Sequence, residues 1–137
     1  ENGAFKNGSP WIIKHKNDHL TYVTDRNLKD TPCATTIENL LHEHVKKLSL
    51  NGVSELAGAG SVLNGILVLE NGPACMLKLP KKENGGGSIW DFAATACIYQ
   101  ELGLPVTDFK GGRLDLNRKD GTFMNQEGIF YANLIKR

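Results

Sequence analysis

The sequence predicts an α/β fold: a layered domain with a mixed central β-sheet and helices on its faces. Segments with apolar residues at helical spacing alternate with short segments rich in β-branched and aromatic residues. Asn-Gly, Gly-Gly and proline turns separate these segments. The chain has 137 residues, of which 40% are hydrophobic and 23% charged, as in ordinary globular proteins. We therefore expect residues 1–137 to form one domain of common size with a substantial core.

The N-terminal quarter is expected to contain a turn and two strands. Asn7-Gly8 is a strong hairpin-turn signal when extended segments flank it. The apolar residues 11–14 predict the strand that follows this turn. Residues 20–24, Leu-Thr-Tyr-Val-Thr, alternate and are rich in β-forming side chains, so they predict a second strand.

A helix is expected next, beginning near Thr35. Glu38 follows Thr35 by three residues, which is the capping-box pattern. Apolar residues then recur at helical spacing until Asn51-Gly52. His42 and His44 lie two residues apart and point to different parts of the helix surface, so they do not form a paired metal site.

A strand over residues 53–57 and a helix ending at Glu70 are expected to flank a small-residue turn. Gly60 would let a backbone approach a ligand closely, and first-turn amides favour an anion or a hydroxyl-rich group. Gly60 and Ser61 are therefore candidate substrate-binding residues. The alternative is that Ser61 is an ordinary N-cap.

A strand over residues 73–79 leads into a glycine-rich loop over residues 80–87. Loops of this kind beside a helix start often carry function. Lys81 and Lys82 are candidate point-charge contacts for a substrate phosphate, and Glu83 is a candidate partner for a substrate hydroxyl. The alternative is a solvated turn with no ligand.

The helix over residues 88–102 has a clear start and stop. Ser88 is the predicted N-cap, Gly103 the predicted left-handed C-terminal residue, and Pro105 forbids continuation. Asp91 in the first turn is favoured by the helix dipole alone. Strands over residues 105–109 and 128–133 complete the pattern. The residues predicted to face the core from this helix are Trp90, Ala93, Ala94, Cys97 and Ile98.

Charge and cysteine usage exclude several classes of protein. The net charge of +1 gives no field to steer a nucleic acid polymer, and no basic cluster is long enough for one. The three cysteines form no Cys-x-x-Cys pair, which argues against a structural zinc site. No apolar run reaches transmembrane length and no signal peptide opens the chain. We expect a cytoplasmic protein that binds neither nucleic acid polymer nor membrane.

Several short motifs stand together along the chain. The most specific is Trp90-Asp91-Phe92-Ala93-Ala94, and the others are Gly3–Pro10, Gly60-Ser61, Glu101-Leu102-Gly103, Asp108-Phe109-Lys110-Gly111 and Gly128–Asn133. Together they resemble the C-terminal signature of the inositol monophosphatase superfamily of metal-dependent sugar and nucleotide phosphatases. The resemblance implies the C-terminal half of that fold, with Asp91 as a ligand of a catalytic Mg²⁺ and Gly60-Ser61 lining the substrate site.

The family's other metal ligands, a Glu-Glu pair and an Asp-Pro-x-Asp-Gly-Thr motif, do not occur in this sequence. We therefore expect this chain to be the C-terminal domain of a Mg²⁺-dependent phosphomonoesterase, with the N-terminal metal-binding half as its partner and a second copy of the chain as a further partner. Because one carboxylate cannot hold a two-metal site, we expect the chain alone to be inactive, and we assign it no catalytic residue.

The resemblance leaves two substrates open, inositol monophosphate and 3'-phosphoadenosine 5'-phosphate. The lysine-rich loop favours the second, as in a bisphosphate nucleotidase. The residues themselves leave two alternatives to a phosphatase open. One is a non-catalytic sugar-phosphate or nucleotide-binding domain derived from this fold, and the other is a purely structural domain in which Asp91 only begins a helix.

Overall fold

The computed structural model describes residues 3–15 and 17–134. A 3-10 turn (Leu28–Asp30) precedes the first helix. The helices are α1 (Ala34–Leu48), α2 (Ser61–Glu70) and α3 (Ile89–Glu101). The strands are β1 (Phe5–Lys6), β2 (Ser9–Pro10), β3 (Leu20–Thr24), β4 (Val53–Ala57), β5 (Ala74–Lys78), β6 (Val106–Thr107) and β7 (Ile129–Asn133).

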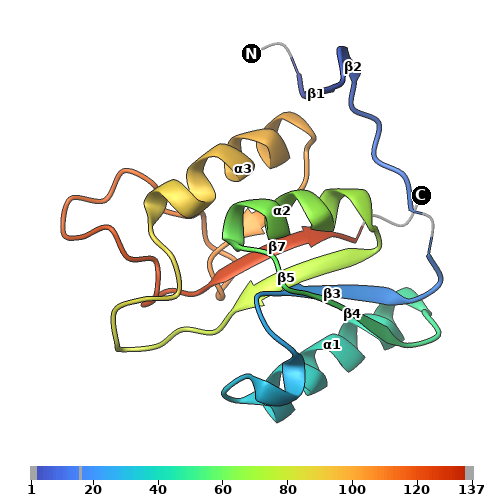
Figure 1. The fold of residues 1–137 in the computed structure, drawn as a ribbon, viewed down its shortest axis with the longest axis horizontal. Coiled ribbons are helices and arrows are strands. Elements are labelled where there is room, and N and C mark those ends of the chain that lie inside the picture. Colours follow the sequence, from blue (N-terminus) through green and yellow to red (C-terminus); the bar gives the residue numbers. More distant parts are fainter. Residues whose placement is uncertain (1–2, 16, 135–137) are drawn as a thin grey trace.

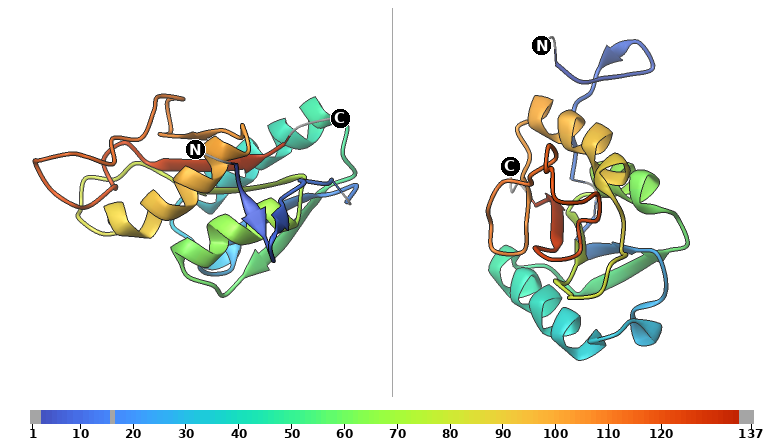
Figure 2. Two further views of the ribbon diagram at one scale, coloured as in Figure 1. Left: turned by 90° about the horizontal axis from the view of Figure 1, so that it is seen from above. Right: turned by 90° about the vertical axis from the view of Figure 1, so that its left-hand side faces the viewer.

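A mixed five-stranded sheet forms the centre of the molecule, in the order β4-β3-β5-β7-β6. Strand β3 is parallel to β4 and β5, whereas β7 is antiparallel to β5 and β6. Helix α1 covers one face of the sheet, and α2 and α3 cover the other (Figures 1 and 2). The predicted α/β layer fold is therefore confirmed.

The alternation of side chains along β3 and β5 divides the core into two clusters. Tyr22 and Cys75 point toward α1, where they pack with Leu41 and its neighbours. Val23 and Met76 point the other way and pack in the cluster shared with α2 and α3. Each strand thus contributes to both faces, as expected for strands with helices on both sides.

Helix α3 buries a different face from the one predicted. Trp90 is 66% exposed, and Ala94 and Cys97 are also exposed. The predicted core stripe is therefore wrong for these residues. The reason is that α3 carries a second stripe whose hydroxyl groups are satisfied internally. Its buried residues are Phe92, Thr95, Ala96 and Tyr99.

Three local predictions near the helix and strand starts are also corrected. Helix α1 begins after Cys33, whose backbone is left-handed, so Thr35 and Glu38 lie inside the helix and form no capping box. It ends at Leu48, with Ser49 left-handed, before Asn51-Gly52. Residues 11–14 form no strand. The Asn7-Gly8 turn is confirmed, but it joins the short strands β1 and β2.

Buried hydroxyl groups fix α3 against α2 and β7. The Tyr99 hydroxyl donates to the Gly65 carbonyl oxygen at 2.7 Å, and the Tyr131 hydroxyl donates to the Phe92 carbonyl oxygen at 2.8 Å. A Cβ at Gly65 would lie 3.1 Å from the nearest atom of the Thr95 side chain. Glycine in the middle of α2, which costs about 1 kcal/mol relative to alanine, is therefore explained by this close approach. The contacts of Gly65 with Thr95 and Tyr99 fix the position of α2 relative to α3.

Candidate functional site

Two helix starts lie at the carboxyl end of the parallel strands. Because β3, β4 and β5 are parallel, their carboxyl ends share one edge of the sheet. Helix α2 follows β4 through a short turn, and α3 follows β5 through the loop over residues 79–88. Figure 1 shows both helices beginning above this edge, on the left of the view. In α/β sheets, ligands bind at such carboxyl edges.

Asp91 occupies the first turn of α3 and is half-buried. Its Oδ2 accepts a hydrogen bond from the Ser88 amide at 2.8 Å, and Ser88 and Asp91 together form a capping box. Ser88 is therefore confirmed as the N-cap. Within the described residues Asp91 forms no ion pair with a lysine, arginine or histidine. Its carboxylate is consequently not neutralised by a side chain of the described part of the chain.

The turn before α2 differs in detail from its prediction. The N-cap is Gly60, with extended backbone, and Ser61 is the first helical residue, so Ser61 is not the N-cap. A Cβ placed on Gly60 would meet nothing within 4 Å. Space around the backbone at Gly60 is therefore open, as a ligand approaching the first amides of α2 would require.

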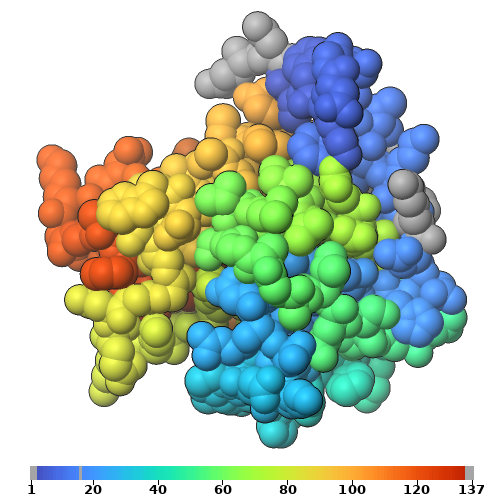
Figure 3. Space-filling model, in the orientation of Figure 1, coloured from blue at the N-terminus to red at the C-terminus, as the bar shows by residue number. Residues whose placement is uncertain are grey.

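The loop between β5 and α3 is attached at both ends to residues 122–125. The Lys81 amide donates to the Asn125 carbonyl oxygen at 2.8 Å, and the Asn125 side chain donates back to the Lys81 carbonyl oxygen at 2.9 Å. The Gly87 carbonyl oxygen accepts from the Met124 amide at 3.0 Å. Figure 3 shows the two segments side by side at the left end of the molecule.

The predicted loop contacts are exposed at the end of the molecule where α3 begins. The Lys81 side chain passes close to the glycines, since its Nζ would lie 3.5 Å from a Cβ at Gly85. Lys82 and Glu83 are exposed. The loop geometry thus leaves Lys82 and Glu83 facing solvent, with the backbone around them anchored.

One polar cluster at the same edge was not predicted. Asp25 directly follows β3, Lys78 ends β5, and Asn64 lies in α2. Lys78 Nζ lies 2.5 Å from Asp25 Oδ2, and Asn64 Nδ2 donates to Asp25 Oδ1 at 2.7 Å. Asn64 is fully buried, and its Oδ1 has no hydrogen-bond partner in the described structure. The strand order, which brings β3 beside β5, is what joins these residues.

In the part of the chain that the structure describes, this edge presents carboxylates singly and not as a cluster. Among the described residues, no three histidine, cysteine, aspartate or glutamate side chains converge on one point. Asp91 suits Mg²⁺ in ligand type, because Mg²⁺ prefers carboxylate oxygen. This chain therefore offers a metal one carboxylate at the α3 start.

No helix in the described part of the chain is long and apolar enough to cross a membrane.

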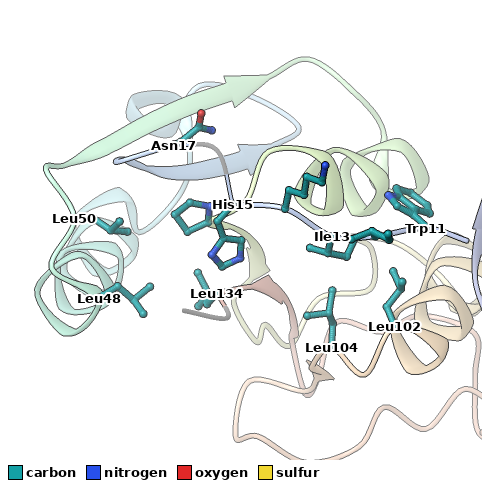
Figure 4. Close-up of a pocket in the computed structure, with 12 residues that line it drawn as sticks. Trp11, Ile13, His15, Asn17, Leu48, Leu50, Leu102, Leu104 and Leu134 are labelled. Atoms are coloured by element: carbon teal, nitrogen blue, oxygen red, sulfur yellow. The ribbon is translucent and has the colours of Figure 1, made fainter. Parts of the chain in front are cut away.

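A cavity outside the predicted site lies at the opposite end of the sheet. It has a volume of about 630 Å³ and is bordered by the segment before β3 and by the C-terminal end of α3. Leu48, Leu102 and Leu104 provide much of its apolar wall, and His15 lies inside it, with its Nε2 2.9 Å from Asn133 Oδ1 (Figure 4). None of the predicted site residues lines this cavity.

Comparison with solved structures finds two IMPase structures that share the fold of this chain. The chain superposes on Thermotoga maritima IMPase with a TM-score of 0.53 and 17% identity, over 96% of this chain and 43% of that one. It superposes on a dual specific IMPase/NADP phosphatase bound with D-inositol-1-phosphate with a TM-score of 0.59 and 17% identity, over 95% of this chain and 43% of that one. The chain spans less than half the length of either structure. No protein-family model and no curated protein matches the sequence.

Proposed function

We propose that this chain is the C-terminal domain of a Mg²⁺-dependent phosphomonoesterase of the inositol monophosphatase type. The observation that carries the proposal is the position of Asp91 and Ser61. They begin two helices that are fixed against each other at the carboxyl edge of the sheet, in a fold like that of IMPase structures. Localisation in the cytoplasm is part of the proposal.

Each residue has a defined task in this proposal. Asp91 would hold the metal through its carboxylate, since the Ser88 amide already fixes its orientation. The first-turn amides of α2, beside Gly60 and Ser61, would bind an anionic or hydroxyl-rich part of the substrate. Bound Mg²⁺ polarises a phosphate ester and activates water. The remaining metal ligands would come from the N-terminal half of the enzyme.

The proposed substrate is a small phosphorylated metabolite, either 3'-phosphoadenosine 5'-phosphate or inositol monophosphate. The two exposed residues Lys81 and Lys82 favour the first, because a second phosphate would find a cation there. Glu83 would instead favour a hydroxyl-rich sugar. Comparing the rates of phosphate release from the two compounds decides between them.

The test is phosphate release in Mg²⁺ by this chain alone and by the chain together with the polypeptide encoded upstream of it. We expect no release from the chain alone and Mg²⁺-dependent release from the combination. Asp91→Asn should abolish that release, whereas Glu43→Gln on the exposed side of α1 should not. Full activity of Asp91→Asn would refute the proposed metal-binding role of Asp91, and no release from the combination would favour the alternative of a binding domain without catalysis.

A further inference from the structure

We propose that Asn125 is a positioning residue for the substrate. Its buried side chain holds the backbone of Lys81 and Lys82, so that these two lysines stand at a set distance from the Asp91 carboxylate and receive a second phosphate group. The inference rests on the proposed function and deepens it. The substrate is a small metabolite with two phosphate groups, and Asn125 contributes to that preference without touching the substrate.

The first observation is that Asn125 is buried although its partners lie in an exposed loop. Asn125 is 5% exposed. Its Nδ2 donates to the Lys81 carbonyl oxygen at 2.9 Å and to the Lys82 carbonyl oxygen at 3.4 Å. The Lys81 amide donates in return to the Asn125 carbonyl oxygen at 2.8 Å. Because buried polar groups are stable only when they are hydrogen-bonded, these contacts tie the lysine end of the loop to a fixed point.

The residues just before Asn125 hold the other end of the same loop. The Met124 amide donates to the Gly87 carbonyl oxygen at 3.0 Å, and the Thr122 carbonyl oxygen accepts from the amide of Ile89, the first residue of α3, at 2.8 Å. Met124 is 6% exposed and belongs to the core cluster on the α2 and α3 side of the sheet. One short segment therefore anchors both the lysine end and the helix end of the loop.

The helix end of the loop lies against the Asp91 carboxylate. The Ser88 amide donates to Asp91 Oδ2 at 2.8 Å, and a Cβ at Gly87 would lie 3.5 Å from the same oxygen. Since the adjacent residues Met124 and Asn125 hold the two ends of the loop, they set the spacing between the lysine backbone and this carboxylate. A site that contacts two groups of one substrate gains from such a fixed spacing, because less freedom is lost on binding.

The two lysines are available to an anionic ligand. Lys81 and Lys82 are exposed, and within the described residues neither forms an ion pair, whereas Lys78 pairs with Asp25. The loop over residues 79–88 carries only one carboxylate, Glu83, against the two lysines. Lysine ammonium groups bind phosphate as point charges. With a first phosphate at the metal on Asp91, the lysines are left for a second one.

The test compares two substrates that differ by one phosphate, 3'-phosphoadenosine 5'-phosphate and adenosine 3'-phosphate. It uses the chain together with the polypeptide encoded upstream of it. Asn125→Ala should raise the KM for the bisphosphate at least about tenfold and leave its kcat within about threefold, because a misplaced contact loses most of its contribution. Both constants for the monophosphate should stay within about threefold. Asn117→Ala, which removes an exposed amide nearby in the chain, is the matched control and should change neither KM by more than about twofold.

A double-mutant cycle measures whether Asn125 acts through the lysines. Lys81→Met and Lys82→Met together should raise the KM for the bisphosphate by a factor similar to that of Asn125→Ala. Adding Asn125→Ala to the lysine variant should then raise it little further, since residues that act as a unit are not additive. Thermal unfolding of each variant confirms that it folds. Because both lysines are exposed, their variant tests the inference even where Asn125→Ala does not fold.

Three results would overturn the inference and leave the proposed function standing. They are equal losses on the two substrates in Asn125→Ala, additive effects in the cycle, and an unchanged KM for the bisphosphate in the lysine variant. Release from neither compound by the unsubstituted enzyme is a different result. It would refute the proposed function, and the inference would fall with it.

Discussion

Replacing Gly87 by alanine tests how the loop before α3 positions the start of that helix. Gly87 has a φ of +109°, which side-chain-bearing residues rarely adopt. A Cβ there would lie 2.6 Å from two ring atoms of Phe92 and 3.5 Å from Asp91 Oδ2. Phe92 is fully buried, so its ring cannot move aside freely. The substitution therefore adds a steric clash to backbone strain.

Two contributions set the size of the effect. Backbone strain costs about 1–3 kcal/mol. Forcing an additional methyl group against a packed ring costs a further 1–3 kcal/mol or so. Gly86→Ala is the matched control, because Gly86 also has a positive φ of +74° but its Cβ would lie 3.6 Å from the flexible Lys81 side chain. Both variants thus place a Cβ at a positive φ, but only Gly87→Ala adds the clash, and its φ of +109° lies further from the left-handed region that alanine can adopt.

Thermal unfolding of the two variants measures the difference. We expect Gly87→Ala to unfold at a lower temperature than Gly86→Ala, by roughly 3–10 °C for a difference of about 1–3 kcal/mol. Equal unfolding temperatures would refute the reasoning, because they would mean that the ring of Phe92 does not restrict this position. Restoration of the Gly87→Ala unfolding temperature by Phe92→Leu would support the clash as the cause.

Three further predictions concern the buried core. Tyr99→Phe should lower the free energy of unfolding by about 0.5–1.5 kcal/mol, measured in urea, because it removes the hydrogen bond from the Tyr99 hydroxyl to a buried carbonyl oxygen of α2. Burial raises the pKa of Tyr131 from 10.0 to about 12 and that of Cys75 from 9.0 to about 12. The folded state therefore keeps protons that the unfolded state loses, so the contribution of these two groups to stability should be constant below about pH 9 and fall toward pH 12 in a urea series. A thiol reagent at neutral pH should label the exposed Cys33 and Cys97 of the folded chain, and Cys75 only after unfolding; three rapid reactions would contradict its burial.

The secondary structure was largely predictable because its signals are local. The strand over residues 20–24 and the helix beginning after Ser88 are found where alternation, capping and turn residues indicate them. Gly103 directly follows the C-cap residue of α3 and has the left-handed backbone that was predicted for it, with a φ of +68°. These features depend on a few neighbouring residues, whose conformational preferences are present in the sequence itself.

The buried face of α3 was not predictable from spacing. Trp90 and Phe92 each begin an apolar series, so the sequence offers two stripes on one helix. The structure buries the second because Tyr99 and Thr95 find hydrogen-bond partners inside, in the Gly65 carbonyl and the Tyr131 hydroxyl. Counting hydroxyl-bearing residues as polar therefore selects the wrong face, and only packing against α2 and β7 decides it.

The sequence by itself determined the order of the helices and strands from residue 20 onward, Ser88 as the N-cap of α3, and Asp91 as an acid in its first turn. Tertiary structure alone decided which distant residues meet. Asp25 and Lys78 lie 53 positions apart and pair because β3 and β5 are parallel neighbours. Strand order depends on contacts between segments far apart in the chain, and local preference carries no record of those contacts.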